Sequence, residues 1–147
     1  FDRDHQIEDL VVNRQTFGNQ TALREFIRTN LHEFEELRGL ADIEDEFPFP
    51  SGRKIDLLAT RPRRNQLVGI ELKLGEAKDG AVGQCQHYID DLKIAAENRG
   101  MDAHFILISG GNPNRSVRTR IESYARTRTV TVDLLLHSVE MRLRTHR

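Results

Sequence analysis

The sequence predicts an α/β fold in which a mixed central β-sheet is flanked by helices. Short runs of aliphatic and β-branched residues, bounded by Gly, Pro and Asn, alternate with longer stretches whose apolar residues recur every three or four positions. Taken in order, these patterns give helix, three strands, helix, strand, helix and strand, with a hairpin at residues 52–74 in the centre. At 147 residues and 37% hydrophobic content, the chain is large enough to bury the core of one domain.

The N-terminal part of the chain divides into an arm and the start of a domain. Residues 1–18 hold a few apolar residues, among them Ile7, Leu10, Val11 and Phe17, in a polar background and indicate an arm or a short helix. Residues 19–147 indicate one globular domain. Because the chain begins at Phe1 rather than Met, we expect it to be part of a longer protein. A helix is expected from Asn19 or Thr21, which suit an N-cap, to Gly39. Its apolar positions are Leu23, Phe26, Ile27, Leu31, Phe34 and Leu37.

The other elements follow from shorter patterns. A strand over residues 43–49, with Pro48 inside it and Pro50 directly after it, is expected at an edge of the sheet. A helix over residues 81–98 ends before Gly100. The buried stripe expected on that helix consists of Val82, Cys85, Ile89, Leu92 and Ala96. The remaining predictions are strands at 103–109 and 129–137, a helix at 115–124, and a further short strand at 139–144.

The hairpin carries charged residues where its strands are otherwise apolar. Asp56 lies in the first strand. In the second strand, Glu71 and Lys73 project to one face, and Ile70, Leu72 and Leu74 project to the other. Pairing of the strands brings Asp56 beside Glu71. Buried carboxylates and ammonium groups are costly unless they are paired or bind a metal. One interpretation is a structural ion pair between Lys73 and an acid; the other is a magnesium site for phosphodiester hydrolysis, since Mg²⁺ prefers oxygen ligands.

The spacing of these three residues resembles a known nuclease pattern. Asp56, fourteen residues, Glu71, one residue and Lys73 are similar to the D…(D/E)xK motif of the PD-(D/E)XK nuclease superfamily, with Ile55 in place of the proline of its name. Residues 20–95 resemble the catalytic domain of NucS/EndoMS-type endonucleases. This resemblance implies a restriction-endonuclease-like fold with an αβββαβ core.

The resemblance also implies roles for individual residues. Asp56, Glu71 and the carbonyl of Leu72 would hold Mg²⁺, for which Mn²⁺ can substitute, and Lys73 would position the attacking water. Gln84 and Tyr88 match the Gln and Tyr of the family's "QL.RY" helix, and Gln84 would assist catalysis. Nucleases of the superfamily often supply a further acid from the helix before the hairpin. The sequence does not say whether one of the four candidates serves here: Glu25, Glu33, Glu35 and Glu36.

Composition limits the other functional classes. The chain has one cysteine, Cys85, which excludes a disulfide framework within the chain and Cys-based zinc sites and fits a reducing cytoplasm. Its six histidines lack zinc-ligand spacing. No apolar run is long enough to span a membrane. With a formal net charge of −1, nucleic-acid binding must depend on local clusters. We expect the hairpin tip (Arg61, Arg63 and Arg64), together with Tyr88, to contact nucleic acid.

The predicted function is a magnesium-dependent DNA endonuclease of DNA repair or of anti-phage defence. The expected partners are DNA, a second copy in a homodimer, and a DNA-reading domain or subunit outside this sequence. Two alternatives remain. In the first, the chain is a catalytically inactive module of nuclease fold that binds nucleic acid. In the second, it is a protein-interaction domain in which the acids and Lys73 only form an ion pair.

Overall fold

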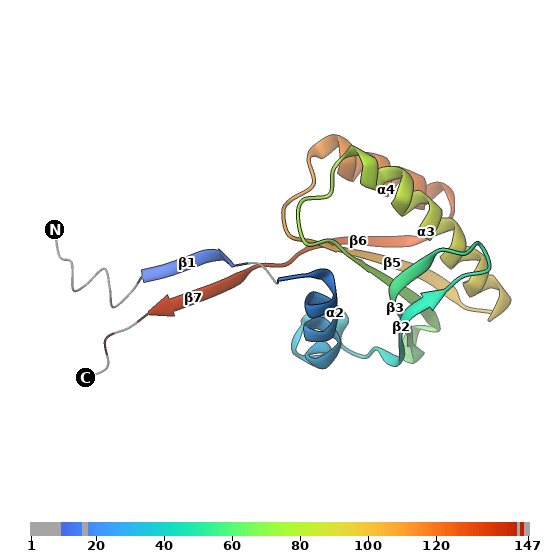
Figure 1. The fold of residues 1–147 in the computed structure, drawn as a ribbon. Helices are drawn as coiled ribbons and strands as arrows, with labels where there is room; N and C mark the ends of the chain where they lie inside the picture. Colours follow the sequence, from blue (N-terminus) through green and yellow to red (C-terminus); the bar gives the residue numbers. More distant parts are fainter. Residues whose placement is uncertain (1–9, 16–17, 144, 146–147) are drawn as a thin grey trace.

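A five-stranded mixed sheet forms the centre of the molecule, with helices on both faces (Figure 1). The computed structural model describes residues 10–15, 18–143 and 145. Helices α3 and α4 cover one face of the sheet, and α2 and two short 3₁₀ turns cover the other. The helices are α2 (Gln20–Thr29), α3 (Asp79–Asn98) and α4 (Arg115–Thr127). The strands of the sheet are β2 (Ala41–Pro48), β3 (Lys54–Arg61), β4 (Gln66–Leu72), β5 (Asp102–Ser109) and β6 (Thr131–Leu136).

The predicted fold class and the order of elements are confirmed. The strands lie in the order β2-β3-β4-β5-β6, antiparallel from β2 to β4 and parallel from β4 to β6. The proline-containing strand β2 is at an edge, as expected. The hairpin turn contains a 3₁₀ turn at Pro62–Arg64 and then Asn65, whose φ of 51° is left-handed. Residues of the predicted stripe on α3 are buried, and Gly100, with φ of 66°, follows the helix.

The prediction of one continuous helix up to Gly39 is wrong. Asn19 caps α2 by accepting a hydrogen bond from the N–H of Ala22, but the helix ends at Thr29. The side-chain amide of Asn30 donates to the carbonyl of Phe26, and this local hydrogen bond competes with continuation of the helix. Two 3₁₀ turns, η1 (Leu31–Glu33) and η2 (Glu35–Leu37), follow and keep the apolar side chains on the sheet.

A two-stranded ribbon extends from the domain (Figure 1). Strand β1 (Leu10–Gln15) pairs antiparallel with β7 (Val139–Leu143), with Leu10 opposite Leu143. Residues 10–15 are therefore part of an arm and not of a helix, while residues 1–9 and 16–17 lie outside the described residues. The strand predicted after residue 138 exists, but it joins this ribbon instead of the central sheet.

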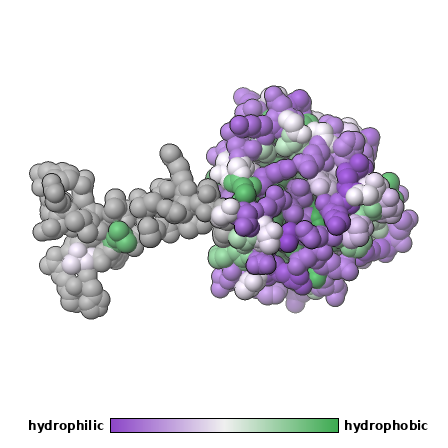
Figure 2. Space-filling model, viewed as in Figure 1, coloured by the Kyte–Doolittle hydropathy of each residue, from purple (hydrophilic) through white to green (hydrophobic). Residues whose placement is uncertain are grey.

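The surface differs from the core in polarity. The face seen in Figure 2 is mostly hydrophilic, with small apolar areas scattered over it. Two apolar clusters fill the layers on either side of the sheet. Within the described residues, no helix is both long and apolar enough to cross a membrane.

Candidate active site

The two predicted carboxylates lie side by side where the β3–β4 hairpin opens. Regular pairing of the strands ends at Leu57 opposite Ile70. Beyond it, the N–H of Asp56 donates to Glu71 Oε1 at 3.4 Å, and Asp56 Oδ2 accepts from the N–H of Leu72 at 2.8 Å. Carboxylate oxygens thus take hydrogen bonds that carbonyls would take in a regular ladder. The predicted proximity of Asp56 and Glu71 is confirmed.

Burial makes this pair electrostatically unfavourable when both acids are ionised. Asp56 is 9% exposed and Glu71 is 4% exposed. Burial, followed by the neighbouring Asp56, raises the pKa of Glu71 to about 8, and Lys73 opposes this shift. Two acids in contact in a largely dry site need either a proton or a cation between them. The site therefore has the charge of a cation-binding site.

Lys73 is held by the helix that carries the predicted glutamine. Its ammonium group donates to Gln84 Oε1 on α3, so the predicted glutamine and lysine are in direct contact. Ile70 and Leu72 point into the cluster under α2 instead, as the alternation of side chains predicts. Glu71 and Lys73 therefore share the face of the sheet that α3 covers.

Tyr88 is buried near the two acids and contacts the start of β3. Its ring is buried, and its hydroxyl donates to the carbonyl of Lys54 at 2.8 Å, close to where β3 separates from β4. Burial, followed by the charges of Glu71 and Asp56, raises the pKa of Tyr88 to about 12, so the hydroxyl keeps its proton. Tyr88 thus holds the start of β3 in place and offers no exposed ring for stacking on a base.

Gln20 belongs to the site although the sequence did not indicate it. Its Nε2 lies 3.1 Å from Asp56 Oδ2 and 3.3 Å from Oδ1, and it donates from the first turn of α2. In the described part of the chain, no hydrogen bond reaches Asp56 from the four glutamates considered as further acids, and all of them are exposed. The signal that could have indicated Gln20 was its position directly after the N-cap Asn19, on the helix that precedes the hairpin.

His137 is a second residue that sequence reasoning missed. Its Nε2 lies 2.8 Å from the carbonyl oxygen of Lys73 and must carry the hydrogen, because a carbonyl only accepts. The N–H of Lys73 in turn donates to Ile108. Next to these contacts, a Cβ on Gly110 would lie 2.0 Å from the carbonyl oxygen of Leu74, so only glycine fits there. The end of β4 is fixed by β5 and by the residue that follows β6.

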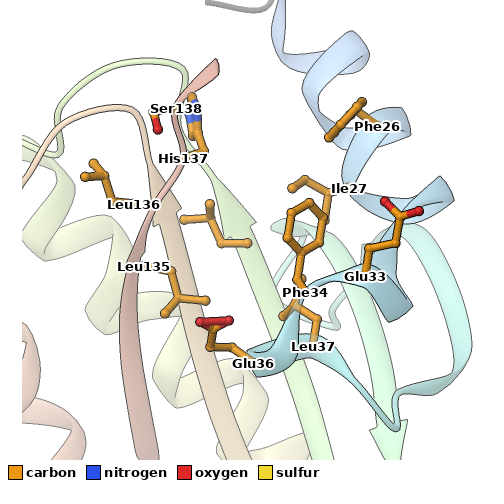
Figure 3. Close-up of a pocket in the computed structure, with 11 residues that line it drawn as sticks. Phe26, Ile27, Glu33, Phe34, Glu36, Leu37, Leu135, Leu136, His137 and Ser138 are labelled. Carbon is orange, nitrogen blue, oxygen red and sulfur yellow. The ribbon is translucent and has the colours of Figure 1, made fainter. Parts of the chain in front are cut away.

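His137 also lines a cavity of about 530 Å³ between α2 and the end of β6 (Figure 3). Figure 3 shows the aromatic and aliphatic side chains of Phe26, Ile27, Phe34 and Leu37 on one side of this cavity and Leu135 and Leu136 on the other. Of the residues considered for the site, Glu33 and Glu36, two of the candidates for a further acid, line it, whereas Asp56, Glu71 and Lys73 do not. Because the cavity is mainly apolar, it does not suit a metal ion or a phosphate. We therefore place the candidate active site at Asp56 and Glu71 and not in this cavity.

The hairpin tip lies at the other end of the strands from the acids. Asp56 is near the first residue of β3 and Arg61 is its last, so at about 3.3 Å per residue they are roughly 16 Å apart. Arg61 is buried and donates to Gln66, His104 and the carbonyl of Glu36. Its guanidinium is thus used inside the fold, and contact with nucleic acid stays a prediction for the exposed Arg63 and Arg64.

The donor set suits a hard cation. Among the described residues, no three side chains of His, Cys, Asp or Glu gather as metal ligands. The site instead offers two carboxylates, those of Asp56 and Glu71. Mg²⁺ is commonly bound by one or two carboxylates and completes its shell with water and substrate phosphate. The residues present therefore fit this ion.

Comparison with known proteins agrees with the fold. No protein-family model and no curated protein matches the chain. Among solved structures, a repair endonuclease from Pyrococcus abyssi superposes with a TM-score of 0.61 at 22% identity. The chain has a nuclease-like fold. The match covers 83% of this chain and 49% of the endonuclease, so the chain spans about half the length of that protein. The restriction-endonuclease-like architecture predicted from the sequence is confirmed.

Proposed function

We propose that the chain is a metal-dependent DNA endonuclease domain that hydrolyses phosphodiester bonds. The observation that carries this proposal is the contact of Asp56 with Glu71 at the open end of the hairpin, beside a lysine held by Gln84. A structural ion pair alone would not require two buried acids in contact. The similarity to a repair endonuclease favours a role in DNA repair over one in defence against foreign DNA.

Each residue has a chemical role in this proposal. Asp56, Glu71 and the carbonyl of Leu72 would hold Mg²⁺ or Mn²⁺, and the bound ion supplies positive charge to the phosphoryl oxygens and lowers the pKa of water. Gln20 and the N–H of Leu72 orient Asp56. The ammonium of Lys73 orients the attacking water and stabilises the negative charge that develops on the phosphate. Gln84 keeps that ammonium in place.

The wider assembly belongs to the same proposal. DNA is the substrate. The match covers only 49% of the endonuclease, and a protein of that length would have room for a separate DNA-reading domain. A homodimer, a separate reading subunit and a cytoplasmic location stay predictions.

Alanine substitution of the three central residues tests the proposal. Asp56→Ala, Glu71→Ala and Lys73→Ala should each reduce cleavage of plasmid DNA by about a hundredfold or more, and double variants should be little worse, because the groups act together. Glu25→Ala, at an exposed glutamate of α2, is the matched control and should keep full activity. Cleavage should require Mg²⁺ or Mn²⁺ and stop in chelator or in Ca²⁺ alone.

Two outcomes would contradict the proposal. Cleavage in excess chelator would exclude the metal mechanism. If instead the wild-type chain binds duplex DNA and takes up no Mn²⁺ in calorimetry, the alternative of a catalytically inactive nucleic-acid-binding module holds.

A further inference from the structure

Arg24 is a nearly buried arginine whose hydrogen bonding is incomplete. It lies on α2, its side chain is 13% exposed, and its Nη1 donates to Glu46 Oε1 of β2 at 3.2 Å. Its Nε is buried and, within the described residues, has no hydrogen-bond partner. Native proteins rarely leave a buried N–H without an acceptor, and such a group calls for an explanation.

The position of Arg24 places it at the edge of the candidate active site. It follows Gln20 by four residues, so the two side chains are neighbours on the same face of α2. Gln20 contacts Asp56. In the β2–β3 pairing, Asp45 is opposite Leu57 and Phe47 is opposite Ile55, which puts Glu46 level with Asp56. The Arg24–Glu46 pair therefore lies beside the acids.

The present partner of Arg24 is easily exchanged. The side chain of Glu46 is 57% exposed, so water and salt weaken its attraction for the guanidinium. A phosphate group offers several oxygens and can accept two parallel N–H bonds from one guanidinium, which Glu46 does not do here. A phosphate is thus a better partner for this side chain than the one it has.

We propose that Arg24 is a substrate-positioning residue that leaves Glu46 and binds a backbone phosphate of DNA next to the scissile bond. This inference rests on the proposed endonuclease function and names a residue of the substrate site. It also gives the chain, whose formal net charge is −1, a second cation besides Lys73 close to the acids, whereas Arg63 and Arg64 lie at the far end of the hairpin.

The neighbouring ion pair provides a matched control. Arg28, one turn further along α2, pairs with Asp45 of β2, so both arginines tie the same helix to the same strand. Arg28 lies one turn further from Gln20 and is 44% exposed. A purely structural role predicts similar behaviour for the two pairs, and a substrate role predicts a difference.

The test measures binding of a fluorescent duplex in Ca²⁺, without turnover, over a series of salt concentrations. Arg24→Gln should weaken binding by about tenfold and reduce the slope of log K against log salt by about 0.9, the value for one phosphate contact. Arg24→Lys should keep the slope. Glu46→Gln breaks the same tie but frees the arginine, so its binding should equal or exceed that of wild type. Arg28→Gln should leave the slope unchanged.

The outcomes separate the two proposals. An unchanged slope in Arg24→Gln, or weaker binding in Glu46→Gln, would overturn the role of Arg24 while leaving the endonuclease proposal in place. If Arg24→Gln does not fold, the comparison of Glu46→Gln with wild type still decides. Failure of the wild-type chain to bind duplex DNA even at low salt would overturn both.

Discussion

At the scale of single residues, the two acids of the site have different surroundings. Asp56 accepts hydrogen bonds from Gln20 and from the N–H of Leu72, while Glu71 accepts a longer one from the N–H of Asp56. Hydrogen bonds to a carboxylate favour its charged form, and burial disfavours it. Without a cation, burial and the neighbouring Asp56 therefore favour the protonated form of Glu71, in agreement with its raised pKa.

This difference predicts how metal-free stability depends on pH. The pKa of Glu71 rises from 4.5 in the unfolded chain to about 8 in the folded protein, so the folded state favours the protonated acid. The stabilisation is complete below pH 4.5 and is lost as pH rises through about 8. Thermal unfolding in chelator should show a falling Tm over that range. Glu71→Gln should flatten the curve, and added Mg²⁺ should raise the Tm of wild type above pH 7. A Tm of wild type that is independent of pH would contradict the buried-acid assignment.

Gln20 leads to a second prediction at this scale. Gln20→Glu would place a third carboxylate against Asp56, which should tighten Mn²⁺ binding in calorimetry and lower metal-free stability through repulsion. Gln20→Ala removes a donor and should weaken Mn²⁺ binding by a smaller amount. Thr29→Ala, on the exposed end of the same helix, serves as control. Equal Mn²⁺ affinity in all three variants would remove Gln20 from the site.

At the scale of secondary-structure elements, local patterns predicted what depends on neighbours in sequence. The alternation around Glu71 correctly placed Ile70 and Leu72 on the opposite face, and the strand pairing correctly brought Asp56 beside Glu71. Gln20 and His137 were missed because each contacts a residue far away in sequence, Asp56 in the first case and Lys73 in the second. The end of α2 was missed because the apolar spacing continues past Asn30, whereas the regular helix stops at Thr29 and two 3₁₀ turns follow.

The contact from His137 to the end of β4 gives a prediction at the scale of elements. His137→Leu removes the donor to the carbonyl of Lys73, so kcat should fall by about tenfold with little change in KM, because Lys73 would be less well held. His137→Gln keeps an N–H donor at a similar reach and should retain most activity. Hydrogen exchange of residues 73–76 should accelerate in the leucine variant only. Identical exchange and kcat in both variants would show that the contact does not position Lys73.

At the scale of the whole molecule, charge limits how tightly this chain could bind DNA. The formal net charge is −1, and the exposed arginines of the hairpin tip lie away from the acids. We therefore expect weak, non-specific DNA binding that falls steeply with salt. Binding of a mismatched and a fully paired duplex at two salt concentrations checks this. Tight, salt-resistant preference for one duplex would show that a reading surface lies within this sequence.

The ribbon of β1 and β7 has a consequence for the order of folding. Every neighbouring pair of strands in the central sheet is consecutive in sequence, so each can pair soon after its residues leave the ribosome. The ribbon instead joins Leu10 to Leu143, across nearly the whole described chain. Closing so large a loop in the unfolded chain is entropically costly. Once the intervening domain has folded, the two strands are separated by much less flexible chain, and this cost falls. The ribbon should therefore pair last during synthesis, after the domain between its strands has folded.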